Sequence, residues 1–61
     1  MGVKQKSVPV SDNVSAELEI DVIDGEELDT RVKLDGEFWV SGSQYREFCQ
    51  KLGELIDEYR I

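Results

Sequence analysis

The chain has 61 residues with 14 acids and 7 bases, giving a formal net charge of −7. This length allows one domain at most, and the negative charge argues against direct binding of nucleic acid or an anionic membrane surface. One cysteine and no histidine exclude an intrachain disulfide and a four-ligand zinc site. No run approaches the roughly 18 apolar residues of a membrane helix, and no apolar signal segment is present, so we expect a cytoplasmic protein.

Residues 1–13 are mostly polar and contain Pro9 and the turn-forming run Ser11–Asn13. Proline cannot donate a backbone hydrogen bond and is confined to outer positions of a sheet. We therefore expect a flexible N-terminal arm or a short edge strand here. Residues 14–61 are expected to form a single β-β-β-α domain.

Residues 14–23 alternate strictly between apolar and polar side chains, which predicts a strand with one buried face. Turn-forming residues follow at Asp24–Gly25, and residues 28–34 then alternate again, predicting a second strand. The even-numbered side chains of both strands should face inward, so residue numbers of facing pairs should sum to an even number.

Two registers of this hairpin satisfy that condition. A sum of 52 places Asp21 opposite Arg31 and Glu19 opposite Lys33, which gives two favourable charge pairs. A sum of 50 sets Asp21 against Asp29, a pair of like charges. We favour the first register.

The dipeptide Asp35–Gly36 is a strong hairpin signal, and residues 37–41 are predicted to form the third strand of an antiparallel meander. A two-residue loop would put Phe38 and Val40 on the outer sheet face, whereas a three-residue loop would put Trp39 there. Either arrangement exposes a large apolar side chain that needs a cover. These three residues are the candidate apolar interface.

A helix is predicted over residues 42–59, with Ser41 and Gln44 placed as a capping box. Its apolar residues recur at three- and four-residue spacing and should pack across one face of the meander. These residues are Tyr45, Phe48, Cys49, Leu52, Leu55, Ile56 and Tyr59. Gly53 is either a solvent-side glycine or a point where another element approaches closely.

No combination of residues predicts catalysis or a cofactor site. Cys49 has no histidine to activate it and is expected to be a buried, inert thiol. A calcium loop built around Gly25 would need oxygen ligands where the chain has Ile20 and Val22. We therefore expect no enzyme, no catalytic residues, no metal site and no cofactor.

The predicted first hairpin is strongly acidic, with seven acids and no base between residues 17 and 29. Such a surface either keeps a small protein soluble or attracts a basic partner. The candidate partner-binding residues are Glu17, Glu19, Asp21, Asp24, Glu26, Glu27 and Asp29.

A chain of this size gains little net free energy from burying its own core, because conformational entropy nearly offsets the hydrophobic gain. Without a disulfide or a metal, self-association is the simplest remedy. We therefore expect a homodimer.

The run from Phe38 to Gly42, the helix and the terminal run from Leu55 to Ile61 resemble the ends of small, uncharacterised bacteriophage or prophage proteins. The order of strand, Asp-Gly turn, strand and serine-capped helix is also similar to acidic anti-CRISPR proteins that imitate DNA. The resemblance implies a phage accessory protein that binds a host factor in the host cytoplasm.

Together these features predict a non-enzymatic protein-binding module that inhibits or modulates a basic, nucleic-acid-binding host protein through its acidic hairpin. The alternative is a small structural or assembly accessory protein that acts through an apolar sheet face. A third hypothesis is an antitoxin-like partner of a small toxin.

Overall fold

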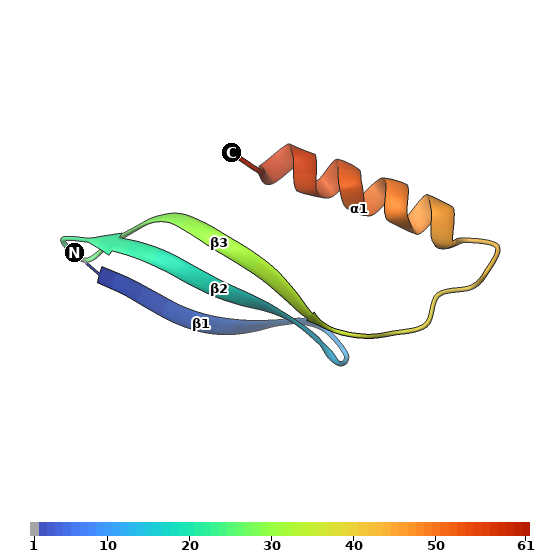
Figure 1. Cartoon of the computed structure of the whole chain (residues 1–61), viewed down its shortest axis with the longest axis horizontal. Helices are drawn as coiled ribbons and strands as arrows, with labels where there is room; N and C mark the ends of the chain where they lie inside the picture. The colour runs from blue at the N-terminus through green and yellow to red at the C-terminus, as the bar shows by residue number, and fades with distance from the viewer. Residues whose placement is uncertain (1) are drawn as a thin grey trace.

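The computed structural model describes residues 2–61, and Met1, the first residue of the expected arm, lies outside the described residues. Three strands form one antiparallel sheet in the order β1-β2-β3, and a helix follows at the C-terminal end (Figure 1). The elements are β1 (Gly2–Ser11), β2 (Val14–Ile23), β3 (Glu26–Gly36) and α1 (Tyr45–Tyr59). The predicted α+β fold, three antiparallel strands and one C-terminal helix, is confirmed.

Strand β2 is the centre of the sheet and spans the predicted residues 14–23. Two tight turns join it to its neighbours. In the turn before β3, Asp24 and Gly25 have φ angles of 53° and 79°, the left-handed pair that a two-residue hairpin of matching twist requires. In the turn after β1, Asn13 has a φ of 62°, which asparagine tolerates better than most residues.

The N-terminal segment forms a ten-residue edge strand, Gly2–Ser11, in place of a flexible arm or a short strand. It pairs with β2 along almost its whole length, because both sides of a central strand carry backbone groups that need partners. The pairing shifts between Pro9 and Ser11, so Val10 is an extra residue on β1. Pro9 is tolerated because β1 has no neighbour on its outer side.

The predicted third strand at residues 37–41 is wrong, because these residues have no strand structure. The third strand of the sheet is Glu26–Gly36, which contains the predicted second strand, so Asp35 and Gly36 close no hairpin. Gly36 ends β3 opposite Val14 with a φ of 123°. A β-carbon here would collide with the backbone carbonyl of Asn13, so glycine serves a close approach of two chain segments.

The register between β2 and β3 also differs from the favoured one. Facing residue numbers sum to 50 along most of the pair, so Glu19 faces Arg31 and Glu17 faces Lys33. Neither Glu19–Lys33 nor Asp21–Arg31 is a facing pair. The observed register is therefore the one that the sequence analysis rejected, and it also gives two pairs of opposite charge.

A bulge removes the like-charge contact that made this register look unfavourable. The pairing shifts between Ile20 and Val22, and Leu28 and Asp29 of β3 both stand opposite the single residue Asp21. The two aspartates therefore do not form a directly facing pair. Such a bulge adds a residue to one strand and re-aims its side chains.

Helix α1 begins at Tyr45, three residues later than predicted, and ends at Tyr59. Its N-cap is Gln44, which makes no side-chain cap hydrogen bond, so the expected capping box does not form. The amide of Gln44 instead donates to the carbonyl oxygen of Ser41 at 2.9 Å, and the amide of Ser43 donates to Ser41 Oγ at 3.4 Å. Ser41 thus stabilises a separate turn that precedes the helix.

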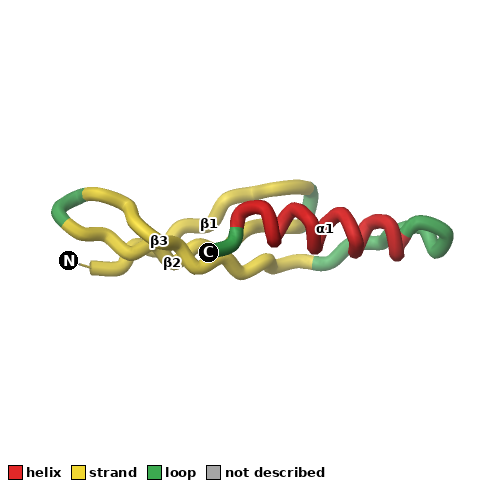
Figure 2. The backbone as a smooth tube through the Cα atoms, turned by 90° about the horizontal axis from the view of Figure 1, so that it is seen from above, coloured by secondary structure: helices red, strands yellow, loops and turns green. Residues whose placement is uncertain are grey.

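The helix does not pack on a face of the sheet, which corrects the prediction. No Cα atom of α1 lies within 8 Å of a Cα atom of any strand, and no helix residue is buried. The helix runs back beside β3, in the same layer as the sheet (Figures 1 and 2), and the chain measures 48 × 23 × 11 Å. Consequently Cys49 is exposed rather than buried, and a β-carbon at Gly53 would meet open space.

We expect Gly36→Ala to lower the free energy of unfolding by about 2 kcal/mol or more. The new β-carbon would collide with the backbone of Asn13, and alanine would be strained at the positive φ of this position. Gly42→Ala is the matched control, since a β-carbon there meets nothing within 4 Å, and it should change stability by less than about 0.5 kcal/mol. Urea titration followed by circular dichroism measures both values. Equal effects of the two substitutions would contradict the close approach at Gly36.

Candidate interaction surfaces

The observed register gathers apolar side chains from all three strands on one face of the sheet. Directly opposed residues point to the same side, and alternate residues of a strand share a face. We call this surface the apolar sheet face. It comprises Val8 of β1, Ala16, Leu18, Ile20 and Val22 of β2, and Val32 and Leu34 of β3.

Only the middle of the apolar sheet face is shielded from water. Among the described residues, Ala16 and Ile20 are the buried ones, at 8% and 4% exposure. Lys4 on β1 pairs with Glu27 on β3 at 3.8 Å, and because these strands flank β2, the ion pair and the lysine stem extend across it beside Ile20. Toward the opposite end of β3, Val32 and Leu34 remain exposed.

The helix presents a second apolar surface that lacks a cover. Its apolar residues follow the spacing of one helix side, and we call them the helix stripe. The helix stripe comprises Tyr45, Phe48, Leu52, Leu55, Ile56 and Tyr59, of which all but half-buried Leu52 are exposed.

The predicted apolar interface residues lie in the segment that joins β3 to α1. The rings of Phe38 and Phe48 of the helix pack edge to face, with 5.5 Å between the ring centroids. Trp39 is fully exposed at 100%, and Val40 is exposed as well. Because no strand forms here, the question of which side chain faces out of a sheet does not arise.

The seven candidate acids are divided between two regions. Glu17 and Glu19 lie on the opposite, polar sheet face, where Lys33 and Arg31 face them. Glu17 also accepts hydrogen bonds from Ser7 Oγ at 2.9 Å and from Ser15 Oγ at 2.8 Å. These contacts tie its carboxylate into the sheet and reduce its availability to a partner.

The other five acids cluster where the turn between β2 and β3 closes the hairpin, and we call this cluster the acidic end. It comprises Asp21, Asp24, Glu26, Glu27 and Asp29. Glu27 pairs with Lys4. The sequence analysis treated all seven acids as one surface, although its favoured register already placed Lys33 opposite Glu19. It did not separate the acids that face bases from those nearer the turn.

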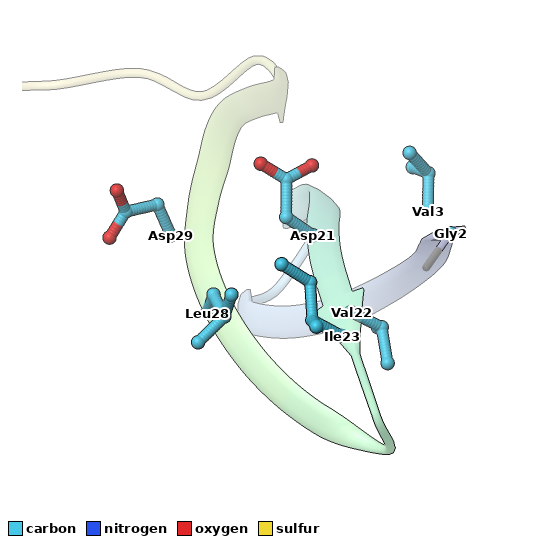
Figure 3. Close-up of a pocket in the computed structure, with 7 residues that line it drawn as sticks. All are labelled: Gly2, Val3, Asp21, Val22, Ile23, Leu28 and Asp29. Atoms are coloured by element: carbon cyan, nitrogen blue, oxygen red, sulfur yellow. The ribbon is translucent and has the colours of Figure 1, made fainter.

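A hollow of about 380 Å³ lies at the same end of the sheet, between the start of β1 and the hairpin. It is lined mainly by apolar residues, and the side chains of Asp21 and Asp29 point in different directions (Figure 3). Its lining residues are exposed except for half-buried Val22. A hollow this open cannot bury most of a small ligand as binding pockets do.

Within residues 2–61, no cluster of three or more acids or cysteines is placed to hold a metal ion. The helix of the described chain is neither long nor apolar enough to cross a membrane. Protein-family models, curated proteins and solved structures were compared with this chain, and none of them matches it.

The Glu17 contacts predict a measurable coupling on the polar sheet face. Ser15→Ala should lower the free energy of unfolding by about 1 kcal/mol, because it removes a hydrogen bond to a carboxylate. In a Glu17→Ala background the same substitution should cost less than about 0.3 kcal/mol. Urea titrations at one protein concentration measure the four variants, and an equal cost in both backgrounds would show that Ser15 acts independently of Glu17.

Proposed function

We propose that the chain is a non-enzymatic protein-binding module that acts through apolar contact, using the apolar sheet face and the helix stripe. The observation that carries this proposal is that Val32 and Leu34 of the apolar sheet face and most of the helix stripe are exposed, while no Cα atom of the helix lies within 8 Å of a strand Cα atom. Soluble proteins seldom leave large contiguous apolar patches exposed unless something binds there.

Two further features support apolar contact as the main binding interaction. The open part of the sheet face contains Val32 and Leu34, aliphatic residues held at fixed spacing by the strand. The segment beside it contributes Trp39 and Phe38, and aromatic side chains are enriched among the residues that dominate binding free energy. By contrast, Glu17 and Glu19 on the polar side of the sheet lie directly opposite the bases Lys33 and Arg31.

Leu34→Asp should abolish binding of the protein's partner, whereas Gln5→Asp should preserve it. Both add one negative charge, but the first places it on the apolar sheet face and the second on the polar face. The measurement is retention of proteins from a source-cell extract on each immobilised variant. Any protein that the wild type retains should stay bound from about 50 to about 500 mM salt, and undiminished retention of that protein by Leu34→Asp would refute the proposal.

A second candidate function uses the acidic end to bind a basic protein. The supporting observation is that five acids gather at one end of the sheet, next to a single ion pair with Lys4. Electrostatic attraction of this kind raises association rate and specificity, and salt weakens it.

The double variant Asp24→Asn with Glu26→Gln tests this second function. It removes two charges, and asparagine tolerates the left-handed backbone at residue 24. Binding to a basic partner should fall, and its dependence on salt should become shallower. Glu54→Gln with Asp57→Asn removes two charges from the helix as a control, and equal losses in both double variants would indicate a general effect of net charge.

A further inference from the structure

The dimensions of the chain are those of half a compact protein. A compact 61-residue domain has a radius of gyration of about 10.5 Å, whereas this chain measures 14.5 Å. The observed value exceeds even the roughly 13.7 Å expected for a compact domain of twice the length. The chain is a single layer, and stable domains have at least two layers around a shared core.

The exposed surface gives the size of the missing contact. A folded chain of 7.0 kDa exposes about 4,000 Å², but this chain exposes 5686 Å². The excess is about 1,700 Å² per chain. Two chains that each hide this area bury about 3,400 Å² in total, within the roughly 2,000–5,000 Å² of obligate homodimers.

The flat arrangement indicates how a second copy fits. Sheet and helix lie side by side in one layer, with the helix along the β3 side (Figure 1). If a second copy is turned over about a two-fold axis and laid on the first, each helix comes to lie over the partner's sheet. The contact is then the same on both chains, as a two-fold interface requires.

We infer that the partner of the proposed apolar surface is a second copy of this chain, with the helix stripe of each copy covering the apolar sheet face of the other. The inference rests on the proposed function and identifies the partner that binds the apolar surface. Residues 37–44 act as the connection between the copies, and the Phe38 contact with Phe48 fixes the start of the helix to this connection. The exposed Trp39 lies on this connection, where the two chains cross.

The first experiment measures molar mass by light scattering. The wild-type protein should have twice the chain mass, and Leu55→Asp should have the mass of one chain. Leu55 is 53% exposed, and no Cα atom of its helix lies within 8 Å of a strand Cα atom, so this change should leave the fold of the single chain intact. Gln50→Asp adds the same charge on the polar side of the helix and should remain a dimer, while a single-chain mass for wild type overturns the inference.

The second experiment shows which sheet each helix covers. One chain keeps its natural Cys49, and the other carries Val32→Cys with Cys49→Ser. The two chains are unfolded in urea, refolded together and treated with a short bismaleimide, which links nearby thiols. A crosslink between the two different chains supports exchanged helices. Arg31→Cys with Cys49→Ser is the control, because residue 31 points from the polar sheet face, and it should give no such product.

Chains that carry both Cys49 and Val32→Cys separate the remaining outcomes. A crosslink within one chain, at single-chain mass, means that the helix covers its own sheet, and it overturns both this inference and the proposed function. A single-chain mass with no crosslink, while Leu34→Asp still loses a retained protein, overturns the inference alone. In that case the apolar surface binds a protein other than a second copy.

Discussion

An amphipathic strand or helix becomes stable when its apolar side leaves water, and this chain arranges both kinds of element in one layer. That constraint governs the rest of the structure. The sheet buries only Ala16 and Ile20 through its own neighbours, and the helix buries nothing. The central strand is hydrogen-bonded on both sides, while most of the apolar surface of the sheet and helix stays in contact with water.

The parts of the fold that follow from local pattern are visible in the sequence. The alternation from Val14 to Ile23 identifies β2, the Asp24–Gly25 pair identifies its turn, and the spacing of apolar residues places the end of α1 at Tyr59. Failure came at the two edges of the sheet. Residues 37–41 have strong strand composition but do not pair with the outer edge of β3, whereas the mostly polar residues of β1 pair with the free side of β2, and neither segment's own residues reveal that choice.

The candidate sites show the same division between local and long-range information. The sequence located the acids and the aromatic segment, but it could not assign them to surfaces. Register decides that assignment, because a strand residue meets its cross-strand neighbours only after pairing. The bulge opposite Asp21 shows the difficulty, since two aspartates that would face each other in a regular ladder are displaced by one extra residue on β3. The position of the helix is likewise long-range information, because the spacing of its apolar residues predicts an apolar side but not the surface that covers it.

Both outer strands leave one row of backbone amides and carbonyls without a strand partner, which is a general route to amyloid-like polymers. The chain carries recognised protections at each side. Pro9 and the irregular residue Val10 interrupt β1, and β3 alternates charged residues such as Arg31 and Lys33 with its aliphatic ones. These features discourage further strands from adding at either edge of the sheet, which opposes the growth of fibrils.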